Sequence, residues 1–172
     1  MLWTLWLARP YLDLDPAVVP NGREYLSAIQ ANMLWVELGA CGACATWYGH
    51  VSGGLPALAD PLSSALHPLV MATTVGWGIT GGAKLAMIGA FFMGGLAQWW
   101  LARVLGLGLV ARVWGGAMGV AAGHIVSRTE LGAFGLVLST AACALTLAPM
   151  VALSQSGSRR DAVLLGLSLI HI

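Results

Sequence analysis

The second half of this chain is a series of long apolar stretches separated by short polar breaks. Residues 83–105, 109–126 and 131–153 are each apolar over about the 20 residues that an α-helix needs to cross the hydrocarbon core of a bilayer. Within them, charged side chains lie only near the ends. The pattern therefore predicts an all-α fold, with three transmembrane helices over residues 83–153 packed as a polytopic bundle.

Shorter apolar segments occupy the two ends of the chain. Residues 1–9 are apolar and rich in Trp but too short to cross a bilayer, so we interpret them as the end of an incomplete first membrane helix. Residues 154–172 begin with a polar stretch and lead into a further apolar run. We interpret them as a cytoplasmic loop and the start of a truncated helix, and we expect the chain to be a fragment of a larger membrane protein.

A long loop, residues 10–82, precedes the apolar stretches, and we expect it to contain one helix. Within residues 21–37, apolar side chains are spaced as on one helical face, and Asn21 and Glu24 are placed like a capping pair. We expect an amphipathic helix that packs on the bundle or lies on the outer leaflet. The apolar positions are Tyr25, Leu26, Ile29, Met33, Leu34 and Val36.

Glycine and proline dominate the later part of this segment. Gly53 and Gly54 permit backbone torsions that are closed to other residues, while Pro56, Pro61 and Pro68 exclude a continuous helix. The pattern predicts an ordered irregular loop, which is the kind of segment that often holds a ligand.

Composition and charge place the chain in a membrane. Hydrophobic residues make up 58% and charged residues 9%, against about 25% charged residues in soluble domains. Arg103 and Arg112 flank one short turn, and Arg159 and Arg160 follow the third stretch, so the positive-inside rule makes that side cytoplasmic. We then expect residues 10–82 to form an extracytoplasmic first loop, which faces the periplasm or the exterior. The net charge of +1, without a basic run, argues against nucleic acid as a partner.

Small residues recur at every fourth position within the apolar stretches. This spacing aligns them on one helix face and allows two backbones to approach closely, which is how helices commonly pack in lipid. We interpret the following positions as packing faces: Ala86, Ala90 and Gly94; Gly115, Gly119 and Gly123; and Ser139 and Cys143.

Two carboxylates follow the first apolar segment closely. Asp13 and Asp15 lie two residues apart, where they could bind a divalent cation or act as a base near the lipid surface. The alternative is a solvated turn closed by Pro16.

The order of several short motifs resembles a known family. From Trp47 to Pro68 the chain has a Trp, a Gly-Gly pair, Leu-Pro, Ala-Asp-Pro and His-Pro before an apolar stretch. Residues 95–107 read Gly-Leu-Ala-Gln-Trp-Trp-Leu-Ala-Arg-Val-Leu-Gly-Leu, and residues 123–128 read Gly-His-Ile-Val-Ser-Arg. Over roughly residues 10–153 this order resembles YfhO-like membrane proteins of the GT-C glycosyltransferase superfamily. The chain departs from the common Trp-Asn-Pro form, and it has Asp60 where Asn is frequent.

The resemblance implies a transferase that moves a sugar from a polyprenyl-phosphate donor to an extracytoplasmic glycan or protein acceptor. It implies that Asp13 or Asp15 is the base or a ligand of Mg or Mn. The same hypothesis assigns substrate binding to the outer ends of the apolar stretches and to the loop. The candidates are Lys84, His124, Arg128, Glu130, Asp60 and His67, with Arg128 and Lys84 at the lipid phosphate.

Other functions remain open at this point. Cys41-Gly-Ala-Cys44 has the spacing of redox motifs and lies on the oxidising side, which allows thiol–disulfide exchange, although a structural disulfide or idle thiols are the simpler interpretation. Cys41, Cys44, His50 and His67 provide the ligand types of a zinc site but not its compact spacing. A transporter or scaffold fragment is the third alternative, and the lack of charges in the middle of the apolar stretches disfavours transport.

Overall fold

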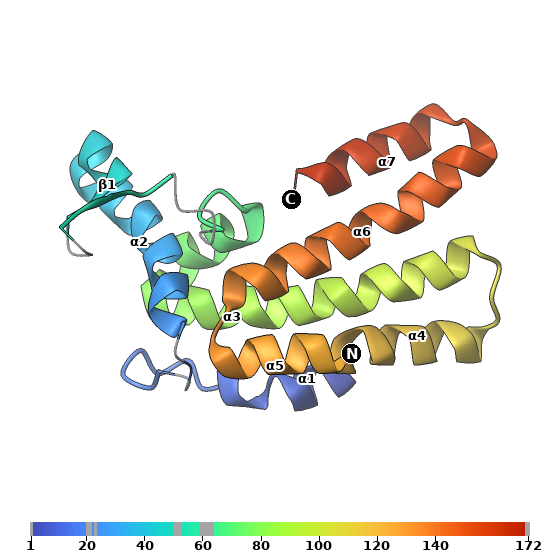
Figure 1. Ribbon diagram of the computed structural model, residues 1–172, viewed down its shortest axis with the longest axis horizontal. Helices are drawn as coiled ribbons and strands as arrows, with labels where there is room; N and C mark the ends of the chain where they lie inside the picture. The colour runs from blue at the N-terminus through green and yellow to red at the C-terminus, as the bar shows by residue number, and fades with distance from the viewer. Residues whose placement is uncertain (1, 20–21, 23, 50–52, 59–63, 171–172) are drawn as a thin grey trace.

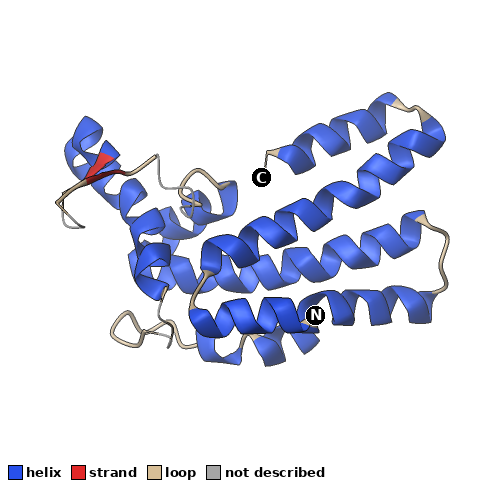
Figure 2. Ribbon diagram, viewed as in Figure 1, coloured by secondary structure: helices blue, strands red, loops and turns tan. Residues whose placement is uncertain are grey.

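The computed structural model describes residues 2–19, 22, 24–49, 53–58 and 64–170, and helices dominate it (Figures 1 and 2). The expected all-α class is confirmed for this part of the chain. The helical elements are α1 (Leu2–Leu7), η1 (Arg9–Tyr11), α2 (Tyr25–Cys41), η2 (Gly42–Thr46), α3 (Pro68–Val104), α4 (Leu109–Ala121), α5 (Gly123–Leu131), α6 (Phe134–Ser156) and α7 (Arg159–Leu169).

Within the described part of the chain, three helices are long and apolar enough to cross a membrane, as the sequence predicts. They are α3, the combined helices α4 and α5 (Leu109–Leu131), and α6. Both α4 and α6 pack along α3, and α7 folds back along α6 (Figure 1). The second of these helices breaks at Ala122, whose ψ of 131° is not helical. We call the end near Arg103 the arginine end and the opposite end, where α5 turns into α6, the loop end.

The helix α3 bends back on itself at Gly78, which has a φ of 74° and a ψ of −170°. A Cβ atom on Gly82 would lie 2.7 Å from the Cα of Thr74, and one on Gly89 would lie 2.6 Å from the Leu69 side chain. These pairs lie at increasing sequence distance on either side of Gly78, so residues 68–77 run antiparallel to the residues that follow Gly78. We call this feature the α3 hairpin, and we call residues 79–104 the long arm of α3.

The α3 hairpin corrects the predicted length of the first loop. That loop was expected to cover residues 10–82, but its last part is helical from Pro68 onward. Proline is compatible with the first turn of a helix, and His67 caps the helix by accepting a hydrogen bond from the Leu69 amide at 3.1 Å. The predicted span from Ala83 lies within the long arm of α3.

The helix α2 crosses the loop end of the longer helices at a steep angle (Figure 1). It is tied to α3 by a buried hydrogen bond of 2.6 Å from the Asn32 side-chain amide to the Thr74 hydroxyl. A second bond of 2.6 Å joins the Trp35 indole N–H to the carbonyl of Ala65, just before α3. These bonds join α2 to the α3 hairpin.

The helix expected over residues 21–37 is therefore present, but displaced and not amphipathic. Val36 is exposed while the polar Asn32 is 2% exposed, because α2 packs between other elements rather than lying on a single apolar surface. Glu24 occupies the N-cap position without a side-chain capping bond, so the expected capping pair does not form through it. Asn21 lies outside the described residues.

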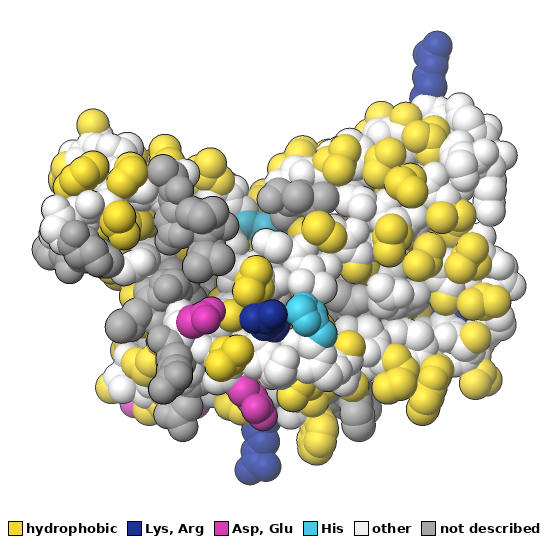
Figure 3. Space-filling view, in the orientation of Figure 1, with side chains coloured by type: hydrophobic (Ala, Val, Ile, Leu, Met, Phe, Trp, Pro, Cys, Tyr) yellow, Lys and Arg dark blue, Asp and Glu magenta, His cyan; other side chains and the backbone are white. Residues whose placement is uncertain are grey.

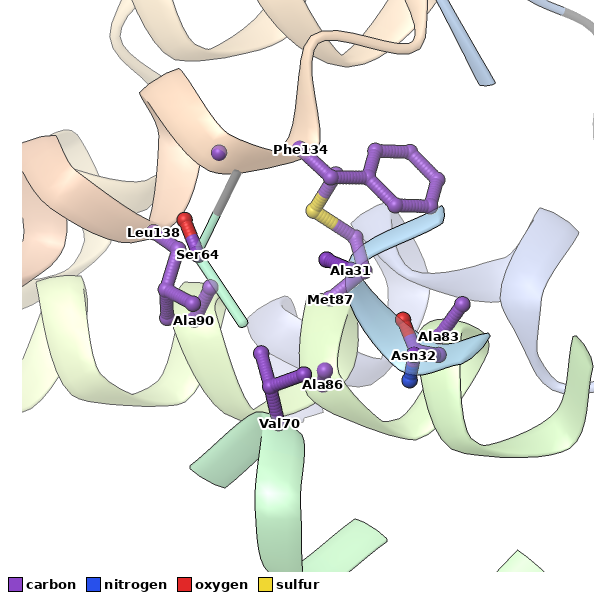
Figure 4. A pocket seen from close by; sticks show the side chains of 11 residues that line it. Ala31, Asn32, Ser64, Val70, Ala83, Ala86, Met87, Ala90, Phe134 and Leu138 are labelled. Atoms are coloured by element: carbon purple, nitrogen blue, oxygen red, sulfur yellow. The ribbon is translucent and has the colours of Figure 1, made fainter. Parts of the chain in front are cut away.

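A small pocket lies at the junction of α2, α3 and α6. It measures about 20 Å³, which is room for about one water molecule and not for a substrate (Figure 4). The walls are formed by Ala31, Asn32, Ser64, Val70, Ala83, Ala86, Met87, Ala90, Phe134, Gly135 and Leu138.

A short antiparallel hairpin pairs β1 (Trp47–Tyr48) with β2 (Leu55–Pro56). Gly53 and Gly54 have φ values of 82° and 112°, as the sequence analysis predicted for this pair. The Tyr48 hydroxyl anchors the hairpin by donating a hydrogen bond to a carbonyl of α2.

Small residues mediate part of the helix packing as predicted. A Cβ atom on Gly119 would lie 2.6 Å from the Gln98 side chain and 3.3 Å from the Gly94 carbonyl oxygen, so α3 and α4 touch there. By contrast, Gly123 has no atom within 4 Å of its Cβ position, and Cys143 is exposed. Those two positions are not packing contacts.

Candidate functional site

The Asp13–Asp15 loop connects η1 to the segment before α2, and its carboxylates shape it. One oxygen of Asp13 accepts a hydrogen bond from the Asp15 amide at 3.0 Å, and one oxygen of Asp15 accepts from the Ala17 amide at 2.9 Å. Both side chains are exposed. Each carboxylate therefore folds the backbone with one oxygen and keeps a second oxygen for other contacts.

Lys84 lies directly beneath this loop and is fully buried. Its ammonium donates hydrogen bonds to the carbonyl oxygens of Asp13, at 2.5 Å, and of Asp15, at 2.8 Å. The sequence predicts that Lys84 lies at an interface, in contact with a lipid phosphate. In the structure its ammonium instead forms hydrogen bonds within the protein, because the Asp13–Asp15 loop covers this part of α3.

An aromatic cluster supports the loop from η1. The Tyr11 ring makes edge contacts with Phe91, at 6.3 Å between ring centroids, and with Phe134, at 5.6 Å. The Tyr25 ring contacts Phe134 at 5.1 Å. The Tyr11 hydroxyl also approaches the Thr129 carbonyl oxygen of α5 at 3.4 Å, so the cluster joins η1, α2, α3, α5 and α6.

Burial keeps both phenols of the cluster neutral. It raises the pKa of Tyr25 to about 12, and it raises the pKa of Tyr11 further above its ordinary value, with a smaller contribution from Tyr25. The Tyr25 hydroxyl has no hydrogen-bond partner among the described residues.

We expect Tyr25→Phe to change alkaline stability and little else. In the wild type the unfolded chain loses the Tyr25 proton above pH 10 while the folded chain keeps it to about pH 12, so the free energy of unfolding falls by on the order of 2 kcal/mol across this range. The substitution removes the part of this fall in the free energy of unfolding that Tyr25 causes, while the part caused by Tyr11 remains. Because the hydroxyl makes no bond within the described part of the chain, stability at pH 7 should change by less than about 1 kcal/mol. Thermal unfolding in detergent at pH 7 and pH 11 measures both, and an equal alkaline loss in the two proteins would contradict the expectation.

The polar face of α5 lies beside the cluster. It carries His124 and Glu130, which are exposed, and Arg128, which is half-buried. Figure 3 shows a basic side chain between a histidine and an acidic side chain on the surface over α5. His124 and Arg128 are one helical turn apart, so three of the predicted substrate-binding residues do share one short helix.

Of the two predicted loop residues, only His67 lies within the described part of the chain, and it has another role. His67 is 8% exposed and caps α3, which gives its ring a structural role at the start of the α3 hairpin. Asp60 lies outside the described residues.

A cavity of about 430 Å³ opens between η1 and α5, next to the Asp13–Asp15 loop. Its size is in the range of ligand pockets, and its walls are apolar apart from a few polar groups at one side. The lining residues are Leu7, Pro10, Tyr11, Phe91, Val120, Val126, Thr129 and Glu130. Residues 10 and 11 thus connect the cavity to the carboxylates that follow them. Sequence reasoning missed Tyr11 and Thr129, although the position of Tyr11 just before Asp13 was a usable signal.

The cysteine motif forms a disulfide. Cys41 and Cys44 are bonded, with their Cα atoms 5.7 Å apart, and both are exposed at the end of α2. The structure therefore favours the structural disulfide over the alternative of a zinc site, because bonded sulfurs are not thiolate ligands and His67 is engaged in capping. No cluster of three or more His, Cys, Asp or Glu side chains occurs within the described part of the chain.

Comparison of the chain with protein-family models, with curated proteins and with solved structures found no match.

Proposed function

We propose that this chain is the amino-terminal part of a polytopic membrane glycosyltransferase. It would transfer a sugar from a polyprenyl-phosphate donor to an extracytoplasmic glycan or protein acceptor. The proposal rests on one arrangement, in which two exposed carboxylates sit on a pinned loop beside an apolar cavity of about 430 Å³. The order of motifs resembling YfhO-like proteins supports it. The arginine end then faces the cytoplasm of a bacterial inner membrane, and the loop end faces the periplasm.

In the proposed reaction, the polyprenyl chain occupies the cavity and the donor phosphate lies at the polar face of α5. One of Asp13 and Asp15 accepts the proton of an acceptor hydroxyl as its oxygen bonds to the anomeric carbon of the sugar. The bond between that carbon and the phosphate oxygen breaks, and the phosphate leaves with the electron pair. Arg128 stabilises the charge that accumulates on the phosphate, while His124 and Glu130 contact the phosphate or sugar hydroxyls.

Asp13 and Asp15 also have the composition of a partial site for Mg or Mn, because Mg is commonly held by one or two carboxylates together with substrate phosphate. Their second oxygens and the donor phosphate would be the ligands. When bound, the cation would offset phosphate charge.

The test is direct transfer of sugar by the protein purified from its complete reading frame. The protein is placed in lipid nanodiscs with a radiolabelled polyprenyl-phosphate sugar and a periplasmic membrane extract as acceptor. We expect label to move from the lipid fraction to the acceptor only when protein is present, and chelator in a parallel sample reports the metal requirement. If the protein consumes none of several polyprenyl-phosphate donors that carry different sugars, the proposal is contradicted.

Arg128→Ala is expected to lower the rate of transfer by about tenfold to a hundredfold, since a cation at the leaving phosphate acts mainly in the transition state. Arg128→Lys retains the charge and should recover part of the rate. Measurement of kcat for the two variants beside Arg159→Ala, at the far end of the molecule, checks the expectation. Equal rates in all three variants would contradict a role at the phosphate.

Thiol–disulfide exchange is the second candidate, favoured by the exposure of the Cys41–Cys44 disulfide. The helix geometry argues against it, because reactive cysteines use the positive N-terminal end of a helix and Cys41 lies at the C-terminal end of α2. Reduction of a quinone or oxidation of a peptide dithiol by the purified protein, lost in Cys41→Ser, would favour exchange over transfer.

A further inference from the structure

The burial of Lys84 calls for an explanation that packing alone does not supply. It lies on the long arm of α3, one of the three helices apolar enough to cross a membrane, and its side chain is 0% exposed. A charged group in such a position is costly unless its hydrogen bonds are satisfied, and ionisable residues there usually have a function. A methionine would fill similar volume without this cost.

The hydrogen bonds of the Lys84 side chain go to a single segment of the chain. Both of its hydrogen-bond acceptors are backbone carbonyls of the Asp13–Asp15 loop, about 70 residues earlier in the chain. Within the described residues, the other hydrogen bonds of the loop are short-range: they are the two carboxylate turns and the bonds from the Leu12 amide to Arg9 and from the Val18 amide to Asp15. Those bonds fix the shape of the loop, but they do not fix its position relative to α3.

We propose that Lys84 is the positioning residue of the Asp13–Asp15 loop. Its two bonds orient the carbonyls of both residues inward, toward α3, while the carboxylate side chains remain exposed. Charge-assisted bonds of this kind are stronger than neutral ones, which suits a loop that must stay in place at the end of a helix bundle. The loop placement follows from the structure alone, whereas the catalytic consequence rests on the proposed function.

Endoproteinase Asp-N, which cleaves before aspartate, reports the loop placement without any assay of activity. The bonds before Asp13 and Asp15 should be protected in the wild type and cleaved at least about tenfold faster in Lys84→Met, because release of the loop exposes its backbone. Lys84→Arg keeps a cation with several donors, and its cleavage rate should lie between the two. Cleavage before Asp161, in the first turn of α7, serves as the internal reference for global unfolding.

Gln98→Met is the matched control, since it also replaces a polar side chain of α3 by methionine but lies far from the loop along the helix. Its cleavage at Asp13 and Asp15 should equal that of the wild type. Equal cleavage in Lys84→Met and Gln98→Met would overturn the proposal. If Lys84→Met does not fold, Lys84→Arg decides instead: cleavage at Asp13 and Asp15 faster than in the wild type supports the proposal, and cleavage at the wild-type rate overturns it.

Transfer kinetics separate positioning from folding. In nanodiscs, Lys84→Met should lower kcat at least about tenfold while KM for the polyprenyl-phosphate sugar changes less than about threefold, because the cavity remains and the carboxylate is displaced. Lys84→Arg should recover part of kcat, and a kcat in Lys84→Met equal to that of the wild type would overturn the catalytic part. A wild-type protein that transfers no sugar would remove the proposed function, and the protease result would still decide the role of Lys84 in the loop.

Discussion

One of the two variants Asp13→Asn and Asp15→Asn is expected to lose sugar transfer by at least about a hundredfold, because removal of a general base typically costs that much or more. Asparagine keeps a side-chain oxygen that can accept the same backbone amide bond, so the turn should persist in both variants. The loss would then report the missing charge rather than a collapsed loop. Initial rates of label transfer in nanodiscs, measured for each variant separately, identify the residue that acts as base.

Two controls isolate this effect. Glu24→Gln removes another exposed carboxylate at the loop end, and Asp161→Asn removes one at the arginine end, where the Ser156 and Ser158 hydroxyls lower the pKa of that carboxyl. Both should transfer at the wild-type rate. Full activity in both Asp13→Asn and Asp15→Asn would exclude this loop as the source of the base, while a hundredfold loss in both would favour a shared cation over a single base.

The sequence was most informative where one physical constraint dominates. Crossing a bilayer demands about 20 apolar residues, and that demand alone located three helices. It could not locate the α3 hairpin, because residues 68–77 are as apolar as a membrane helix and the decisive feature is the positive φ of Gly78. Glycine patterns predict close approach in general, and only the fold shows that Gly119 meets Gln98 whereas Gly123 meets nothing.

The candidate site was predictable in part for a related reason. Asp13 and Asp15 are close in sequence, and so are His124, Arg128 and Glu130, so each group needed only local geometry. Lys84 needed a contact with a loop about 70 residues away, for which a single sequence carries no signal. A lysine near the start of an apolar stretch is usually an interfacial anchor. The structure has it buried because the preceding loop folds over the helix end.

Gly82→Ala is expected to lower the free energy of unfolding by about 3 kcal/mol or more, the upper range for forcing extra volume into a packed interior. The added Cβ would lie 2.7 Å from the Cα and 2.9 Å from the amide nitrogen of Thr74. Both are backbone atoms, so no side-chain rotation relieves the clash and the arms of the α3 hairpin must separate. Thermal unfolding in detergent, followed by circular dichroism, measures the loss.

Gly76→Ala is the matched control, because it makes the same substitution in the same hairpin at an exposed position with no atom within 4 Å. It should be neutral or stabilise the helix by up to about 1 kcal/mol. Equal stability of the two variants would mean that the arms are not in backbone contact. The consequence extends to the candidate site, since Lys84 follows Gly82 by two residues and reaches the Asp13–Asp15 loop only from its present place on the long arm. Gly82→Ala should therefore also expose the loop to Asp-N, whereas Gly76→Ala should leave it protected. This result would show that the position of the two carboxylates depends on the packing of a glycine far from them in sequence.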